Sequence, residues 1–208
     1  MSQDKFLQGY DPQVEWNKRA RTPGPQSVMA LDWSDDQCQQ ATKDLQAVIL
    51  EILKPLAAEK ILEIGCGIGR ITQILSPFCD LTSIDISPEM IKRAALNISG
   101  RFCLASAFNL PFPDDIFDAV FEVTTFQHIV KEEGFELALK EMKRVVRPGG
   151  RIIICDEMTT GKREQPSPYR IIRNPRDYLN LLPGVCLVRI RRFLCVDDNY
   201  ILMRLKKR

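Results

Sequence analysis

Residues 60–69 read Lys-Ile-Leu-Glu-Ile-Gly-Cys-Gly-Ile-Gly, and this stretch decides the fold. The apolar run 61–64 is typical of a buried parallel strand, and Gly65, Gly67 and Gly69 follow it directly. Glycines at this place let backbone amides approach a ligand at the N-terminus of the next helix. The stretch therefore predicts a strand, a ligand-binding turn and a helix.

The spacing of these glycines argues against a dinucleotide. In the GxGxxG fingerprint of NAD- and FAD-binding proteins, the third glycine would stand where this chain has Arg70. Asp85 closes the next predicted strand, where a carboxylate can accept hydrogen bonds from the two hydroxyls of a ribose. The two motifs together predict a ligand that contains a nucleoside.

Beyond the turn, apolar runs alternate with helical patterns, as in a parallel sheet with crossover helices. We predict strands over residues 60–65, 81–86, 101–106, 117–123 and 151–157. We predict helices over 35–54, from 70 to 75, from 88 onward, over 133–146 and over 175–182. The runs 187–196 and 199–208 flank a short polar turn and predict an antiparallel hairpin.

The composition is that of an ordinary globular domain. The 208 residues are 45% apolar and 27% charged, and the net charge is +2. The seven cysteines form no CxxC pair, which disfavours a disulfide framework or a zinc site, and no acidic cluster suggests another metal. We find neither a membrane-spanning run nor a signal peptide, and we expect a cytoplasmic protein with no membrane partner.

The sequence divides into two expected regions. Residues 1–34 are polar and rich in proline, and they predict an N-terminal arm that packs on the core as a lid. Residues 35–208 predict a single domain. Three aromatic residues of the arm are candidates for covering a bound ligand, with ordinary packing as the alternative: Tyr10, Trp16 and Trp33.

Four motifs in order carry a resemblance to a known family. They are LEIGCGIGR at 62–70, TSIDISPEMI at 82–91, LPFPDDIFDAV at 110–120 and RVVRPGGRIII at 144–154. With them, residues 45–157 resemble the class I S-adenosylmethionine-dependent methyltransferases, particularly the small-molecule (type 11-like) group. The resemblance implies a doubly wound, Rossmann-like α/β fold. Its mostly parallel seven-stranded sheet has the order 3-2-1-4-5-7-6 and an antiparallel C-terminal strand.

The resemblance also implies the cofactor and its contacts. S-adenosylmethionine would be the methyl donor and S-adenosylhomocysteine the product. The expected contacts are Glu63, Gly65, Cys66, Gly67 and Gly69 around the methionine portion, Asp85 at the ribose, and Ile86 and Met90 beside adenine. Ser106 stands where the family has an acidic residue, so its hydroxyl or the backbone of Ala107 would contact the adenine amino group.

Candidates for catalysis follow the fourth predicted strand. His128 is the only histidine, and it is the candidate base for a hydroxyl acceptor, with a packed histidine as the alternative. Glu122 is a second catalytic candidate. With Asp156 and Glu157 it could bind a cationic amine or accept its proton, unless these acids serve as caps and salt bridges.

These observations favour a methyltransferase that acts on an oxygen or nitrogen of a small-molecule metabolite. The chain lacks the Asn/Asp-Pro-Pro-Tyr motif of enzymes that methylate planar amino groups. Nucleic acid is not the expected partner, although the basic residues of 187–208 leave an RNA methyltransferase as the alternative. A catalytically inactive cofactor-binding protein is the other alternative. The sequence does not determine the acceptor or the oligomeric state.

Overall fold

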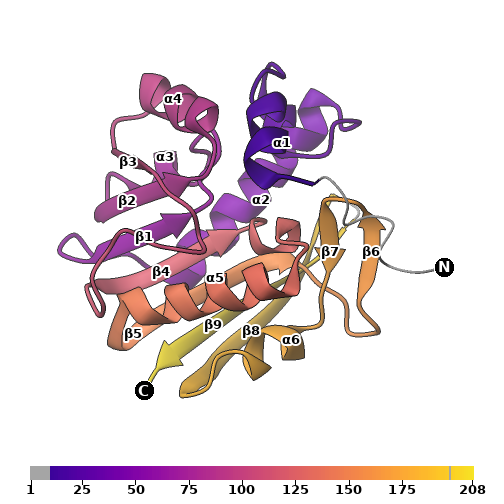
Figure 1. Cartoon of the computed structure of the whole chain (residues 1–208). Coiled ribbons are helices and arrows are strands. Elements are labelled where there is room, and N and C mark those ends of the chain that lie inside the picture. The colour runs from indigo at the N-terminus through magenta and orange to yellow at the C-terminus, as the bar shows by residue number, and fades with distance from the viewer. Residues whose placement is uncertain (1–9, 197) are drawn as a thin grey trace.

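The computed structural model describes residues 10–196 and 198–208. Seven strands form one sheet in the order β3-β2-β1-β4-β5-β9-β8 (Figure 1). They are β1 (Lys60–Ile64), β2 (Asp80–Asp85), β3 (Arg101–Leu104), β4 (Phe117–Val123), β5 (Val146–Glu157), β8 (Val185–Cys195) and β9 (Asp198–Lys207). β9 pairs antiparallel with β5 and β8, and the other neighbouring strands pair parallel. The predicted sheet is confirmed.

Helices cover both faces of this sheet. In Figure 1, α5 (Glu132–Val145) and α6 (Pro175–Asn180) lie in front of the sheet and α2 (Asp35–Leu53) lies behind it. Buried side chains accordingly form two apolar clusters, one containing Phe135 and Met142 of α5 and one containing Leu45 and Ile49 of α2. The helices thus bury the sheet on both sides, as parallel sheets require.

Local sequence chemistry explains where the helices begin. Ser34 and Gln37 form the predicted capping box at the start of α2. Ser87 caps α4 (Pro88–Asn97), and its hydroxyl accepts a hydrogen bond from the amide of Met90. α3 (Thr72–Leu75) is a single turn, and no helix joins β3 to β4. The absence of a helix between β3 and β4 agrees with the prolines of this segment, Pro111 and Pro113.

Three elements differ from the sequence predictions. The arm contains the helix α1 (Pro12–Arg19) and a 3-10 turn over residues 25–28, and the sequence showed no helical periodicity in it. The segment after β5 folds into the hairpin β6 (Glu164–Ser167) and β7 (Arg170–Ile172), which was not predicted. All three are short, so none shows an apolar period in the sequence.

The arm packs against the edge of the sheet where the parallel strands end. Nη1 of Arg93, on α4, donates hydrogen bonds to the carbonyls of Ala20 and Thr22, and Nη2 donates to the carbonyl of Gly24. Figure 1 shows α1 above the carboxyl ends of β1 and β4 and beside the β6–β7 hairpin. The strand order reverses between β1 and β4, and ligands of open α/β sheets bind at this edge.

Candidate active site

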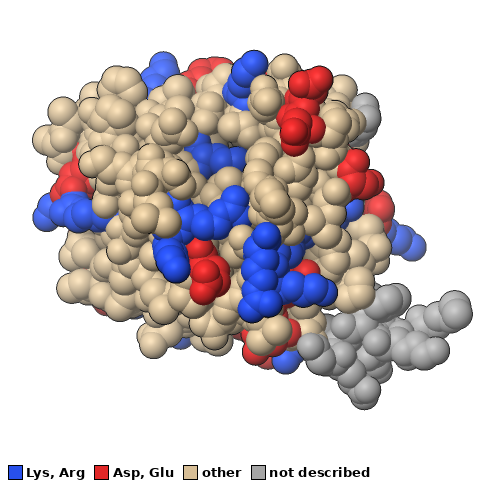
Figure 2. Space-filling model, turned by 90° about the horizontal axis from the view of Figure 1, so that it is seen from above, with Lys and Arg blue, Asp and Glu red and all other residues tan. Residues whose placement is uncertain are grey.

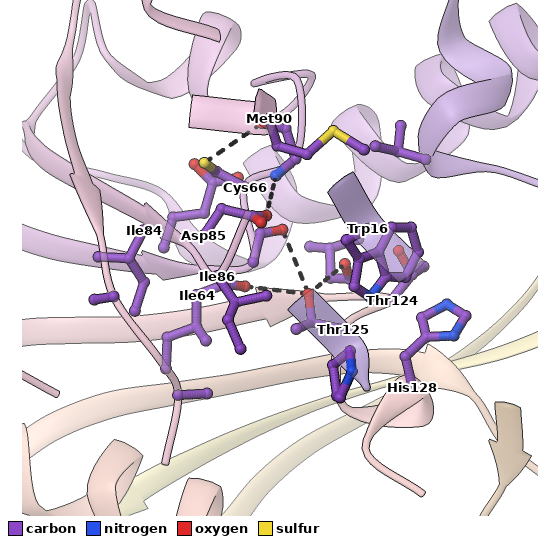
Figure 3. A pocket seen from close by; sticks show the side chains of 18 of the residues that line it. Trp16, Ile64, Cys66, Ile84, Asp85, Ile86, Met90, Thr124, Thr125 and His128 are labelled. Atoms are coloured by element: carbon purple, nitrogen blue, oxygen red, sulfur yellow. Dashed lines mark hydrogen bonds between the residues drawn. The ribbon is translucent and has the colours of Figure 1, made fainter. Parts of the chain in front are cut away.

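The glycine turn joins β1 to α3 and lines a first cavity at this edge (Figure 3). The amides of Gly65 and Cys66 both donate to the carbonyl of Ile84, at 2.8 and 2.9 Å. Gly65 has φ 74°, and a Cβ atom there would collide with the side chain of Thr125. Glycine is therefore required by the positive φ and by the close approach of Thr125, which follows the neighbouring strand β4.

Asp85 ends β2 and faces the same cavity (Figure 3). Its Oδ2 accepts a hydrogen bond from the amide of Gly67 at 2.8 Å, and its Oδ1 accepts one from the amide of Ser87 at 2.9 Å. Burial raises the pKa of Asp85, although the two amides act in the opposite direction. Each oxygen keeps a further lone pair, so the carboxylate can still accept hydrogen bonds from a ligand.

Glu63 is a buried carboxyl at the end of β1 that also lines the first cavity. Its Oε2 accepts hydrogen bonds from Thr72 Oγ1 at 2.5 Å and from Ser83 Oγ at 2.7 Å. Burial raises its pKa to about 7, because desolvation outweighs the two hydroxyl donors. The hydroxyls hold the side chain in one orientation beside the glycine turn.

The other end of the first cavity is formed by the residues after β2 and β3. Ile86, Met90, Ser106 and Ala107 all line it. The hydroxyl of Ser106 accepts a hydrogen bond from the amide of Phe108 at 3.2 Å, so its proton remains available to another acceptor. Gly69 does not line this cavity: its φ is 84°, and a Cβ there would collide with Ile98, so it lets the turn pack against α4.

His128 lies in a short 3-10 turn after β4 and borders the first cavity. Its Nδ1 lies 2.8 Å from the carbonyl oxygen of Tyr169, which can only accept, so Nδ1 carries a proton and Nε2 is an acceptor. The edge of Trp16 meets the imidazole at a centroid distance of 4.9 Å. Burial lowers the pKa of His128 to about 4, so the ring is neutral at pH 7.

Glu122 lines neither the first cavity nor a second cavity that adjoins it. One oxygen of its carboxylate accepts hydrogen bonds from the amides of Thr125 and Phe126, and the other accepts one from the amide of Cys155. These bonds hold the turn after β4. The catalytic assignment of Glu122 is therefore corrected: the side chain is fully buried and serves the backbone.

The two acids at the end of β5 are also engaged elsewhere. Asp156 accepts a hydrogen bond from the hydroxyl of Tyr178 at 2.7 Å, and Glu157 forms an ion pair with Arg170 at 3.0 Å. Neither lines the two cavities. The structure therefore favours the alternative of local hydrogen bonds and salt bridges over convergence of these acids on a substrate pocket.

The structure separates the three candidate lid aromatics. Trp16, on α1, lines both the first cavity and a second cavity beside it, and Trp33 lines only the second. Tyr10 lines neither, and its hydroxyl lies 3.5 Å from the carbonyl of His128. Of the three aromatic residues, Trp16 is thus the one that borders both cavities.

The second cavity adjoins the first and has a volume of about 370 Å³. Five residues border both cavities: Trp16, Val28, Arg70, Thr124 and His128. The sequence reasoning assigned no ligand contact to Val28, Arg70 or Thr124. Thr124 has φ 57°, which is rare for a residue with a branched side chain, and no sequence pattern revealed this conformation.

Fold and site together define an α/β domain with two adjoining cavities at the carboxyl edge of its parallel strands. Residues 62–154 match the family model described as a methyltransferase domain. The methyltransferase domain accounts for these residues, and the seven-stranded sheet has the order that the resemblance to the class I S-adenosylmethionine-dependent methyltransferases implied.

Curated relatives carry methyltransferase names. The chain is 25% identical over 187 residues to methyltransferase GfsG of Streptomyces halstedii, covering 86% of this chain and 60% of that protein. It is 35% identical over 112 residues to a 2-methyl-6-phytyl-1,4-hydroquinone methyltransferase of Synechocystis (51% and 34%). It is 30% identical over 155 residues to the chloroplastic tocopherol O-methyltransferase of Arabidopsis thaliana (69% and 41%). The chain thus spans less than two thirds of each relative.

A solved structure shows the same fold over nearly the whole chain. The N-methyltransferase NodS of Bradyrhizobium japonicum, in complex with S-adenosylhomocysteine, superposes with a TM-score of 0.73 at 18% identity. The match covers 94% of this chain and 97% of NodS.

In residues 10–196 and 198–208, no helix is long and apolar enough to span a membrane. Within the same residues, no cluster of His, Cys, Asp and Glu side chains is arranged to hold a metal ion.

Proposed function

We propose that this chain binds S-adenosylmethionine in the first cavity and transfers its methyl group to a small molecule held in the second. The observation that supports this most directly is the shared border of the two cavities. Such a border lets a donor and an acceptor meet while each is held by its own set of residues. When bound, S-adenosylmethionine supplies an electrophilic methyl group on a sulfonium.

The residues of the first cavity fit this cofactor. Gly65, Cys66 and Gly67 of the glycine turn line this cavity, and Glu63 lies beside them for the methionine portion. Asp85 can accept the ribose hydroxyls, while Ile86 and Met90 offer apolar surface to adenine. The Ser106 hydroxyl or the backbone of Ala107 would contact the adenine amino group.

His128 is the proposed proton acceptor for an acceptor molecule that arrives protonated. Its Nε2 is an acceptor in the neutral ring, and the side chain borders both cavities. The lowered pKa makes it a weak base, so its contribution would be greatest for an acidic hydroxyl. Oxygen or nitrogen as the acceptor atom is not decided by this residue.

Calorimetric titration with S-adenosylmethionine and, separately, with NAD tests the cofactor. We expect S-adenosylmethionine to bind and NAD not to bind. Asp85→Ala should lower the affinity for S-adenosylmethionine by about ten-fold or more, because two ribose hydroxyls lose a charged acceptor. Asp80→Ala, at the opposite end of the same strand, is the matched control and should leave the affinity unchanged.

Two outcomes would contradict this proposal. Binding of NAD alone would overturn the interpretation of the glycine turn, and equal affinities of the Asp85 and Asp80 variants would remove the ribose assignment. Cofactor binding without turnover of any small molecule in a metabolite pool would favour the alternative of an inactive cofactor-binding protein.

A further inference from the structure

The second cavity combines an apolar wall with buried positive charge. Its apolar lining comes from the arm, α2 and the β8–β9 hairpin: Met29, Trp33, Leu45, Cys195 and Tyr200. Three arginines line it as well, namely Arg19, Arg70 and Arg170. Figure 2, which views the molecule from above, shows basic side chains gathered toward the middle of this face. A ligand of this cavity therefore meets both kinds of surface.

Arg19, the last residue of α1, is only 6% exposed. Its Nη2 donates hydrogen bonds to the carbonyls of Gln26 and Met29, so the guanidinium is held in place. The group lies 5.0 Å from the ring centroid of Trp16 and 5.9 Å from that of Tyr169. Its Nε is buried without a hydrogen-bond partner, and burial lowers the pKa of Arg19.

Arg70 stands where the two cavities meet. Its Nη1 donates a hydrogen bond to Thr42 Oγ1 at 3.2 Å, which directs the side chain toward α2. Desolvation by burial lowers the pKa of Arg70 as well. A desolvated cation is costly unless a negative group pairs with it. Arg170 differs from these two, because it already pairs with Glu157.

None of the five residues that border both cavities is acidic. Glu63, which lines the first cavity and raises the pKa of Arg70, is held by the hydroxyls of Thr72 and Ser83. Of the two aspartates that line the second cavity, Asp32 is exposed and Asp198 is the first residue of β9, and neither lines the first cavity. Glu122, Asp156 and Glu157, which could have received a cationic amine, are bound to other partners. The electrostatic environment therefore favours an anion over a cation.

We propose that the acceptor is an apolar small molecule carrying an oxyanion, a carboxylate or an ionised phenol. Arg19 in the second cavity and Arg70 at its border with the first would hold this oxyanion. This inference rests on the proposed function and names its substrate class. The acceptor oxygen forms the bond to the methyl carbon as the carbon–sulfur bond breaks and leaves its electron pair on sulfur. No proton moves, so this acceptor needs no carboxylate base.

Three probes of one shape and different charge test the inference by calorimetry on the full chain: phenylacetate, phenylacetamide and phenethylamine. We expect phenylacetate to bind about ten-fold or more tightly than the neutral amide, and the cationic amine to bind more weakly than the amide. Equal affinity for acid and amide, tighter binding of the amine, or no binding of phenylacetate would overturn the oxyanion assignment.

Substitutions of Arg19 and Arg70 then test which side chains cause the preference for an anionic probe. Arg19→Gln and Arg70→Gln should each lower the affinity for phenylacetate by about ten-fold while changing that for the amide less than about three-fold. Arg19→Lys should retain most of the preference, which a purely structural role of Arg19 would not explain. Arg101→Gln, on β3 outside both cavities, is the matched control. An equal loss for acid and amide in both Gln variants would contradict the inference.

A parallel titration with S-adenosylmethionine separates this inference from the proposed function. If the cofactor binds and the amine is the preferred probe, the oxyanion inference fails alone. If the cofactor does not bind, the proposed function fails, whatever phenylacetate does. Thermal unfolding of each variant checks that the arm is still folded. If the Arg19→Gln variant is unfolded, the affinities of the Arg70→Gln and Arg19→Lys variants are compared instead.

Discussion

Glu63 and Glu122 are buried glutamates one residue before the ends of the neighbouring strands β1 and β4. Glu122 is satisfied by three backbone amides, and it holds the turn after β4. Glu63 is held by two hydroxyls on one oxygen only, and it lines the first cavity. The partner groups, rather than the residue type, determine which of the two can serve a ligand.

The raised pKa of Glu63 predicts a pH-dependent stability. A carboxyl with a folded-state pKa of about 7, above its ordinary value, stabilises the protein when protonated, and this stability is lost as the pH rises from about 4.5 to 7. The Glu63→Gln variant has no ionisable group at this position, so its stability does not fall for this reason as the pH rises. We expect its free energy of unfolding, relative to the parent, to increase by about 1–3 kcal/mol between pH 4.5 and 7.5.

Urea denaturation of the ligand-free protein at both pH values measures this difference. Glu136→Gln, on the exposed side of α5, is the control substitution. If the Glu63 and Glu136 variants differ from the parent in the same way at both pH values, the burial argument for Glu63 is wrong.

At the scale of elements, the arm is tied to the residues between Asp85 and α4 and to α4 itself. Ser87 Oγ donates a hydrogen bond to Asn17 Oδ1 at 2.6 Å, and Gln13 Nε2 donates one to the carbonyl of Ile86 at 3.1 Å. Arg93 adds three hydrogen bonds to carbonyls at the end of α1 and just beyond it. The cover of both cavities and the loop next to the ribose site therefore form one hydrogen-bonded unit.

Arg93→Ala should loosen this unit. The loss of three hydrogen bonds, one of them exposed, predicts local opening that is easier by about 1–2 kcal/mol. Hydrogen exchange of the amides of residues 12–28 should become about ten-fold faster or more, and the affinity for S-adenosylmethionine should fall a few-fold. Lys92→Ala, exposed on the same helix, should change neither. Unchanged exchange in Arg93→Ala would show that packing alone holds the arm.

At the scale of the whole molecule, the basic C-terminal strands bear on the RNA alternative. Arg189 and Arg191 of β8 both form ion pairs with Glu51 of α2, and Lys207 of β9 forms one with Asp115. These pairings reduce the charge that the edge of the sheet offers to a phosphate backbone, and the net charge of the chain is only +2.

We therefore expect only weak RNA binding, with a dissociation constant above about 10 µM at physiological salt. Fluorescence anisotropy with a labelled single-stranded RNA, at about 50 and 200 mM salt, measures it. Tight binding that weakens steeply with salt, and that is lost in Arg191→Gln with Arg192→Gln, would instead favour the RNA alternative.

The sequence predicted the elements with a strong periodic or capping signal. The helices at 35–53 and 132–145, the five parallel strands and the C-terminal hairpin all follow from apolar spacing and end chemistry. The strand β5 begins at Val146 rather than 151, because the Pro148–Gly150 turn pairs irregularly with β4 as a bulge. The helix α1 and the β6–β7 hairpin could not be predicted, since contacts with the rest of the molecule stabilise such short elements.

The sequence by itself determined the parallel sheet, the glycine turn and the position of Asp85, because local backbone chemistry and hydrophobic periodicity act over a few residues. Only the tertiary structure decided which polar residues meet. It directed Glu122, Asp156 and Glu157 to other partners, and it brought Arg19 and Arg70 together on one cavity. Such choices depend on side-chain directions and burial across segments far apart in the chain, which no local pattern records.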